Sequence, residues 1–498
     1  MSKTRTVLKN SAIQAVSQIV TWGLSWILLV MLPRYLGDSQ FGKLFFAISY
    51  GTIFSTLINL GVNTFLVKEV AVLQPAPDMP AADISERRTR LHALMSNVLA
   101  LKLVLAVIIY AVQSLLVYAL PYDAATREAV LIIGLGTCLG AVAQTLGGAF
   151  QGLQYLLAPS VILILEKTVI TAGCAMLLSQ GYSLTAICWV HTAGAVVSFV
   201  LSLGWLYHRE RFGLAWNGLL LRRIFVGGLP FLVWVVFGEI YIRIDVLMLS
   251  LMTSDAVVGW YGAATRLYGT LLFIPNILTM SVFPAMMRMG SSVADEAAFN
   301  RASERLMNLL LFAAIPISAG AIAVAGPLVR LLYGPGSFEN AGPNLQILGV
   351  SILLVCIDVL LGTALIARGK EKAWACMAVA AAFFNPLVNL WAIPLTARIW
   401  GNGGIGAAGA TAMTELLMMF GALYLMPPGV FSRRNWFVGI KGCLIGAAML
   451  VLLRLWGTDD LRLLIPAGVL FYLPLALLWG VLPREDFYHL RHALRRNR

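Results

Sequence analysis

The sequence predicts an all-α polytopic membrane protein with fourteen transmembrane helices, built as two six-helix lobes followed by two extra C-terminal helices. Three observations predict this fold. The chain is 59% hydrophobic and only 12% charged, and its mean hydropathy is +0.84, which excludes an ordinary soluble protein. Apolar runs of about 18 residues or more, the length that crosses a bilayer, recur along the whole chain. Several features also return at a constant offset of 217 residues.

The apolar runs divide the chain into candidate spans whose boundaries are good to about two to four residues. The expected spans are 10–33, 42–62, 92–119, 128–149, 157–179, 183–206, 224–251, 257–283, 306–332, 344–366, 374–397, 404–426, 436–456 and 462–482. The first run lacks a small-residue cleavage site, so it predicts a membrane helix and not a signal peptide. No expected loop is long enough for a soluble nucleotide-binding domain.

The charge pattern predicts the orientation in the membrane. The net charge of +13 would be compatible with nucleic-acid binding, but the lysines and arginines gather in alternate loops and in the tail RHALRRNR. This distribution follows the positive-inside rule of membrane proteins. It places both the N-terminus and the C-terminus in the cytoplasm.

The internal repeat predicts the domain organisation. Asp38 and Gly42, before the second span, return as Asp255 and Gly259 before the eighth, and Asn59 returns as Asn276. Each lobe holds an even number of spans, so the two copies have the same orientation, as in transporters with parallel repeats. We expect an N-lobe over 1–207, a C-lobe over 208–427, and the last two helices with a basic tail over 428–498.

The cysteines and one glycine-rich segment carry no catalytic prediction. All six cysteines lie in apolar segments without metal-ligand or redox spacing, so we expect free, buried thiols and no metal or disulfide. The segment Gly37–Leu44 resembles a phosphate-binding loop, but Leu44 stands where a magnesium-binding hydroxyl belongs and a membrane helix follows. The sequence predicts no ATP hydrolysis by this chain.

The seventh span contains the most informative charges of the chain. Glu239, Arg243 and Asp245 lie inside an apolar run, where a charge costs about 2.5–3.5 kcal/mol at the centre of a helix. Glu239 and Arg243 are four residues apart and share a helix face, so they can form an ion pair. Asp245 points elsewhere and needs another partner. The pattern indicates a functional site, and the alternative is an ion pair that only neutralises itself within the bundle.

Other spans carry further polar residues. The expected cavity cations are Arg243, Arg266, Lys102 and Lys167, and the expected charge partners or coupling residues are Asp245, Glu239, Asn385, Asn389, Thr411, Glu415, Asp358 and Glu166. A cavity lined by these cations would attract an anion such as a diphosphate or an acidic sugar. For each residue the alternative is a bond that holds helices together, and the stem of Lys102 could also extend toward the cytoplasmic face. The glycine-rich turn 401–411 predicts close helix contact, with an unwound, cation-binding turn as the alternative.

Several stretches in order resemble the Wzx-type polysaccharide or O-antigen flippases of the multidrug/oligosaccharidyl-lipid/polysaccharide exporter superfamily. The similar stretches are RYLGDSQFG (34–42), Leu60 to Glu69, Phe150–Gly152, Leu229 to Asp245, Val258 to Arg266, and Asn385 to Thr411. These stretches occur in the same order as in the family and are distributed over most of the chain. The resemblance implies a V-shaped central cavity and the movement of an undecaprenyl-diphosphate-linked oligosaccharide from the cytoplasmic to the outer leaflet by alternating access.

The resemblance also implies a coupling site. The related lipid II flippases bind sodium with an acid on the seventh helix and a pair spaced by four on the eleventh. The matching positions are Asp245, Asn385 and Asn389, with Thr411 or Thr414 as a further ligand. Both residues on the eleventh helix are neutral here, so proton coupling through Glu415 or Asp358 is the alternative to sodium. No other cofactor is expected.

Three further functions are alternatives to a flippase. A small-molecule antiporter of the same superfamily should have an acidic cavity, and a polysaccharide polymerase or ligase should carry a large outer loop with catalytic residues; a non-transporting scaffold is the third. As a flippase, the protein would be a monomer in the bacterial inner membrane. Its partners would be the lipid-linked oligosaccharide, the bilayer, a polysaccharide polymerase and glycosyltransferases, and no nucleic acid.

Overall fold

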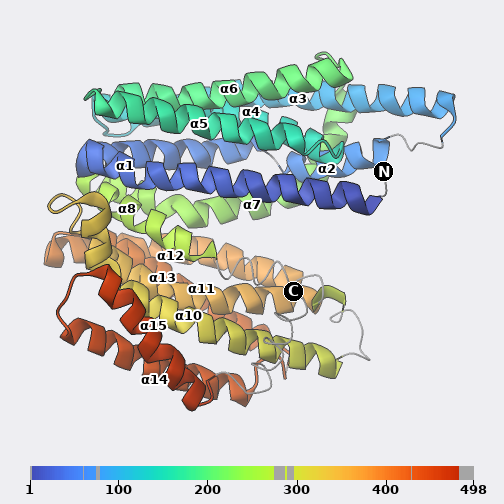
Figure 1. Cartoon of the computed structure of the whole chain (residues 1–498). Coiled ribbons are helices and arrows are strands. Elements are labelled where there is room, and N and C mark those ends of the chain that lie inside the picture. Colours follow the sequence, from blue (N-terminus) through green and yellow to red (C-terminus); the bar gives the residue numbers. More distant parts are fainter. Residues whose placement is uncertain are drawn as a thin grey trace. The chain divides into compact units, whose positions relative to one another are not determined.

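The computed structural model describes residues 3–59, 61–74, 79–273, 286–288, 296–427 and 429–481, and these residues are helical apart from short connections (Figure 1). The chain divides into two compact units, Met1–Leu251 and Met252–Arg498. The helices are α1 (Lys3–Asn59), α2 (Val62–Leu73), α3 (Ala81–Ala119), α4 (Ala124–Gly152), α5 (Leu157–Ser179), α6 (Leu184–Glu210), α7 (Gly218–Met252), α8 (Asp255–Leu271), α10 (Glu296–Tyr333), α11 (Ala341–Ala367), α12 (Glu371–Trp400), α13 (Gly403–Leu425), α14 (Arg433–Leu455) and α15 (Leu461–Leu478).

The predicted spans fall on these helices. Among the described residues, eleven helices are long and apolar enough to cross a membrane, which confirms an all-α, multi-pass membrane protein. The predicted eighth span continues past α8 into residues outside the described ranges. Asn276 of the repeat and the basic tail also lie outside these ranges. The count of fourteen spans and the cytoplasmic side of the termini stay predictions.

The boundary between the two units falls at the end of α7, later in the chain than the predicted lobe boundary at residue 207. Helices α14 and α15 belong to the second unit, whereas the sequence-based prediction assigned them to a separate third region. The three-domain division of the chain therefore also stays a prediction.

A break within α1 separates the first two predicted spans. Gly37 has φ 73° and ψ 174°, so two helical segments meet there. Glycine reaches this positive φ without the steric cost that other residues meet. The second segment continues from Asp38, and α8 begins at Asp255, so these two helical segments start at the repeat offset inferred from the sequence.

The connection between the second and third spans contains a further helix, α2. Gly61, with φ 65°, turns the chain into α2. The residues Val62, Leu66 and Val70 recur at every fourth position and are buried, which is the pattern of a helix that packs one apolar face. They join a core cluster with residues of α3 and α4. Helix α3 also begins at Ala81, eleven residues before the predicted span.

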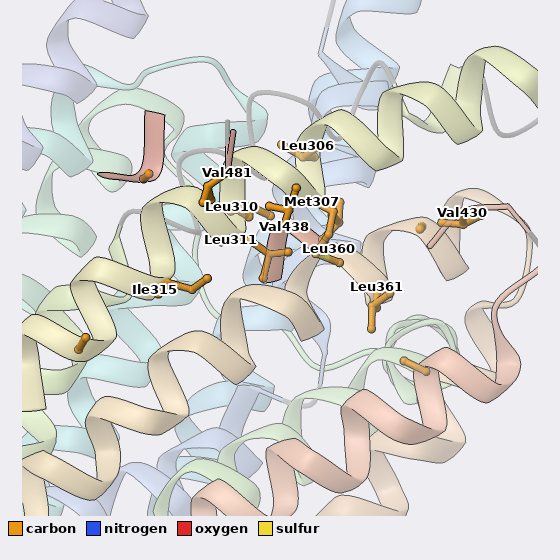
Figure 2. Packing of buried hydrophobic residues seen from close by; sticks show 14 of the residues in the cluster. Leu306, Met307, Leu310, Leu311, Ile315, Leu360, Leu361, Val430, Val438 and Val481 are labelled. Atoms are coloured by element: carbon orange, nitrogen blue, oxygen red, sulfur yellow. The ribbon is translucent and has the colours of Figure 1, made fainter. Parts of the chain in front are cut away.

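The second unit has a core in which α14 and α15 pack on α10. Figure 2 shows Leu306, Leu310 and Ile315 of α10 beside Val438 of α14 and Leu360 of α11, within one buried apolar cluster. A polar contact fixes the same packing, since the side-chain amide of Asn435 donates to Oδ1 of Asn308 at 2.8 Å and to the carbonyl of Glu304 at 3.0 Å. The last two helices are therefore integral to the second unit.

The cysteines correct one prediction. All six are free, but Cys376 and Cys443 are exposed while the other four are buried. Apolar composition does not distinguish a helix face in the core from a face turned outward, because in a membrane the outward face meets lipid. The prediction of burial was therefore wrong for these two residues.

Candidate functional site

The predicted ion pair on α7 is present. The Nε atom of Arg243 donates to Oε2 of Glu239 at 2.8 Å, and both side chains are 27% exposed. The pair follows from the spacing of four residues along a helix. The remaining guanidinium donors of Arg243 keep the fork geometry that binds phosphates and carboxylates.

Asp245 is buried near the end of α7 and has an interaction partner of its own. Asn385 and Asn389 of α12 are fully buried, and Nδ2 of Asn389 donates to Oδ1 of Asn385 at 2.8 Å. The structure thus confirms that the two asparagines share a face. Asp245 belongs to the first unit and the asparagines to the second, so a joint sodium site stays a prediction.

Lys102 holds the end of α1. Its side chain is fully buried, and its Nζ atom donates to the carbonyls of Ile58 at 2.6 Å and Asn59 at 2.7 Å. The carbonyls at a helix C-terminus have no partner within the helix and carry partial negative charge, so an ammonium is well placed there. The geometry gives Lys102 a structural role, and its role as a substrate-binding cation stays a prediction.

Asp358 of α11 and Glu415 of α13 come together inside the second unit. Both side chains are buried, and their carboxyl groups lie within hydrogen-bonding reach of each other. Tyr268 of α8 lies within electrostatic range of both. The sequence predicted each acid as a separate polar residue within a span. The packing of α11 against α13 brings the two acids together.

The remaining predicted residues lie on α5, α8 and α13. Arg266 of α8 is part-buried beside Tyr333 of α10. Glu166 and Lys167 are part-buried neighbours on α5. The Thr411 hydroxyl donates to the carbonyl of Ala407 on its own helix at 3.2 Å. Their roles in binding or coupling stay predictions.

Two further buried polar residues of α11, Asn344 and Ser351, were not predicted from the sequence. Both side-chain polar atoms of Asn344 and the hydroxyl of Ser351 are buried and have no hydrogen-bond partner among the described groups. A signal was available, because Asn344, Ser351 and Asp358 follow one another at intervals of seven residues. That interval keeps residues near one face of a helix.

The glycine-rich turn serves helix contact. Asn402 caps α13, its Oδ1 accepting from the Gly404 amide at 3.0 Å, and α13 is helical from Gly403 onward. A Cβ at Gly406 would lie 2.3 Å from the carbonyl oxygen of Ala392 in α12. The unwound turn weighed above is not formed.

The comparison with protein families identifies the chain at family level. The profile of the family described as "Polysaccharide biosynthesis protein" matches residues 7–290, more than half of the chain. The chain belongs to this family. Over 196 residues, this member of the family is 29% identical to the "Probable flippase AglR" of Haloferax volcanii. The match covers 38% of this chain and 39% of that relative, so it spans well under half of either protein.

Solved structures show the fold. The chain is similar to a structure described as "Lipid II flippase MurJ, inward closed conformation", with a TM-score of 0.71 and 14% identity over 97% of this chain and 100% of the other. A multidrug resistance MATE family transporter of the MOP superfamily gives a TM-score of 0.61 and 12% identity over 87% of this chain and 95% of the other. At these identities the likeness establishes a shared fold.

Proposed function

We propose that this protein is a flippase that moves an undecaprenyl-diphosphate-linked oligosaccharide from the cytoplasmic to the outer leaflet by alternating access. The observation that carries the proposal is the match of residues 7–290 to the polysaccharide biosynthesis family. A relative that is named a probable flippase and a lipid II flippase of the same fold support it. A lipid-linked oligosaccharide would be a substrate compatible with all three findings.

The physical task explains why such a protein would hold charges in its membrane spans. A large polar headgroup cannot enter hydrocarbon, because each polar group that loses its water without a new partner costs several kcal/mol. We propose that a cationic cavity replaces that water, with Arg243, Arg266, Lys102 and Lys167 facing the diphosphate or acidic sugars. The lipid tail would remain in the bilayer throughout.

We further propose the setting in which the protein works. It would be a monomer in a bacterial inner membrane, supplied by glycosyltransferases and followed by a polysaccharide polymerase. Translocation makes and breaks no covalent bond in the substrate, so we expect no enzymatic activity. Sodium held by Asp245, Asn385, Asn389 and Thr411, or protons held by Asp358 and Glu415, would drive the cycle.

A small-molecule antiporter is the second candidate. The fold shared with a multidrug resistance transporter favours it, at a TM-score of 0.61. The basic residues of the spans argue against it, because a cavity for cationic drugs should be acidic. The two candidates differ in substrate and can therefore be separated by experiment.

The test is deletion of the gene in its source organism, followed by measurement of surface polysaccharide and of lipid-linked oligosaccharide in each leaflet. The proposal predicts loss of the surface polymer and accumulation of the lipid-linked precursor in the inner leaflet, with both restored when the gene is returned. An unchanged precursor distribution together with increased sensitivity to cationic drugs would favour the antiporter.

A further inference from the structure

One face of α11 carries a row of buried polar side chains that the proposed function does not explain. Asn344, Ser351 and Asp358 follow one another at intervals of seven residues, and none is more than 3% exposed. Both polar atoms of Asn344 and the hydroxyl of Ser351 lack a hydrogen-bond partner among the described groups. At a rise of about 1.5 Å per residue, the row extends for about 21 Å along the helix.

The row lies where α11 packs against α13. At one end, a Cβ on Gly404 of α13 would be 2.5 Å from Nδ2 of Asn344, so the amide lies directly on that helix. At the other end, the carboxyl group of Asp358 is within hydrogen-bonding reach of Glu415 of α13. The three polar residues therefore follow one helix–helix seam inside the second unit.

The carboxyl pair at the end of the row requires a proton. Two ionised carboxylates in contact repel each other strongly when both are buried, and a hydrogen bond between them needs a hydrogen that neither ion supplies. A single shared proton removes one negative charge and provides that hydrogen. This is the state in which two adjacent, buried acids are stable.

Tyr268 of α8 is a titratable neighbour of the pair and lies within electrostatic range of both acids. From α10, the hydroxyl of Ser318 donates to the carbonyl of Gly349 at 2.7 Å, and from α12, Trp374 packs on Gly362. The basic residue Arg266 precedes Tyr268 by two positions on α8, and it lies beside Tyr333.

The unpartnered atoms of Asn344 and Ser351 indicate water. Buried polar groups are nearly always hydrogen-bonded, and where protein groups do not serve, ordered water does. Successive members of the row are about 10 Å apart along the helix axis, a gap that a short chain of water molecules bridges. Hydrogen-bonded water between such side chains can pass a proton.

We propose that the α11–α13 seam is a proton path, in which Asn344 and Ser351 lead water-borne protons to a proton-binding pair formed by Asp358 and Glu415. One proton leaves bulk water and binds one carboxylate oxygen, and no other bond changes. The positive-inside pattern places the Asn344 end at the outer face, so protons would enter from outside. That this proton drives export rests on the proposed function, whereas the proton site itself does not.

Infrared difference spectroscopy of the purified full chain in lipid nanodiscs, without substrate, tests the pair. A protonated, buried carboxyl gives a carbonyl stretching band that shifts when the sample is transferred to deuterated water. We expect this band in the wild type and its loss in both Asp358→Asn and Glu415→Gln, with Glu166→Gln as the matched control that retains it. The proposal is overturned if the wild type lacks the band or if both variants at the pair keep it.

The path is tested by the rate at which the band shifts. Ser351→Ala should keep the full band but slow its deuterium shift several-fold, because the hydroxyl between Asn344 and the pair is gone. Ser303→Ala is the matched control, since Ser303 of α10 is also a buried serine whose hydroxyl has no partner among the described groups. Equal rates in the wild type and both variants would exclude Ser351 from the path. Thermal unfolding of each variant checks that it is folded, and no arm depends on lipid movement, so failure of the flippase proposal would be seen separately.

Discussion

Lys102 illustrates how a single charged residue is accommodated in a membrane protein. An ammonium in hydrocarbon is costly and normally pairs with an acid or with backbone carbonyls. Here the side chain reaches the carbonyls of Ile58 and Asn59, at the end of α1 where the helix has no further internal donors. The bond joins α3 to the turn between α1 and α2, so it stabilises the point at which the chain changes direction.

Replacement of Lys102 by methionine tests that role. Lys102→Met removes two charge-assisted hydrogen bonds, each worth about 1.5–3 kcal/mol, and leaves two carbonyls without a donor. We expect a lower thermal unfolding midpoint in detergent. Lys167→Met, at a part-buried lysine of α5, should leave the midpoint nearly unchanged. If Lys102→Met instead abolished export at an unchanged midpoint, Lys102 would be a substrate-binding cation.

Arg243 should matter for export and little for folding. Its ion pair with Glu239 is local to α7 and part-exposed, so it contributes little to stability. Loss of one charge-assisted bond to a diphosphate, about 1.5–3 kcal/mol, predicts at least about a tenfold fall in export for Arg243→Ala. The measurement is surface polysaccharide in a deletion strain that carries each variant at equal membrane abundance.

The matched control for Arg243 is Arg90→Ala. Arg90 pairs with Glu86 at the same spacing of four residues, but both side chains are more than half exposed. We expect normal export from this variant. Equal export by the two variants would remove Arg243 from the mechanism.

Asp123 predicts a pH dependence of stability. Burial by itself raises the pKa of Asp123, but hydrogen bonds from the Lys43 ammonium and from Thr126 hold it at about 2, below the ordinary value of 3.8. A lowered pKa contributes stability that is present above the ordinary value and is lost as the pH falls toward the folded value. The thermal unfolding midpoint should therefore decrease as the pH is lowered from about 4 to about 2. The accompanying loss in the free energy of unfolding should be about 1 kcal/mol or less, because the carboxylate is half-exposed.

Asp123→Asn separates this contribution from general acid denaturation. An asparagine side chain can still accept the hydrogen bond from the Thr126 amide and so cap the helix, but it cannot form an ion pair with Lys43. The variant should be less stable than the wild type at neutral pH, and the difference should vanish near pH 2. A difference that persists there would contradict the assignment to the Lys43–Asp123 pair.

How far the sequence predicts the site depends on the distance between partners along the chain. Glu239 and Arg243 are predictable because the helix alone brings them together. Asp358 and Glu415 each appear in the sequence as a buried acid, but their contact depends on how α11 packs on α13. The bonds of Lys102 to the carbonyls of Ile58 and Asn59 could not be predicted, because nothing near Lys102 in the sequence shows that the chain turns at Gly61 and presents free carbonyls.

At the scale of helices, Gly406 allows a close contact between α12 and α13. The three atoms nearest to a hypothetical Cβ at Gly406 are backbone atoms of Ala392 and Ile393, which cannot rotate away. Small residues of this kind allow dense packing between membrane helices. The polar seam between α11 and α13 depends on the same helix being held in place.

Gly406→Ala should therefore destabilise the protein although alanine is the better helix former. Overpacking costs about 1–3 kcal/mol, more than the gain of about 1 kcal/mol in helix propensity. Gly409→Ala is the control, because nothing lies within 4 Å of its hypothetical Cβ, and it should be neutral or slightly stabilising. The thermal unfolding midpoints of the two variants check this prediction. A Gly406→Ala protein with the midpoint of the wild type would contradict the close contact.

Helices were more predictable than connections. Apolar runs locate the spans, because length and composition are all that crossing a bilayer requires. The helix α2 is hard to predict because its twelve residues are too few to cross a bilayer and because it lies before the Pro- and Asp-bearing segment 75–83. Its buried face is recognisable only once α3 and α4 are known to lie beside it.

At the scale of the whole molecule, two compact units of helices form a fold shared with flippases and with drug transporters. A fold used for both tasks does not choose between them. The choice in favour of a lipid-linked oligosaccharide rests on the polysaccharide biosynthesis family and on the predicted cavity cations. The substrate is thus the central claim about this molecule.

The most direct test of that claim is the movement of a fluorescent undecaprenyl-diphosphate oligosaccharide between leaflets of liposomes that contain only the purified protein. An impermeant quencher reports the fraction of the lipid in the outer leaflet over time. The account predicts protein-dependent movement that Arg243→Ala reduces and Arg90→Ala does not, with no uptake of a small cationic dye. A lipid that stays in its original leaflet while the dye accumulates would contradict it.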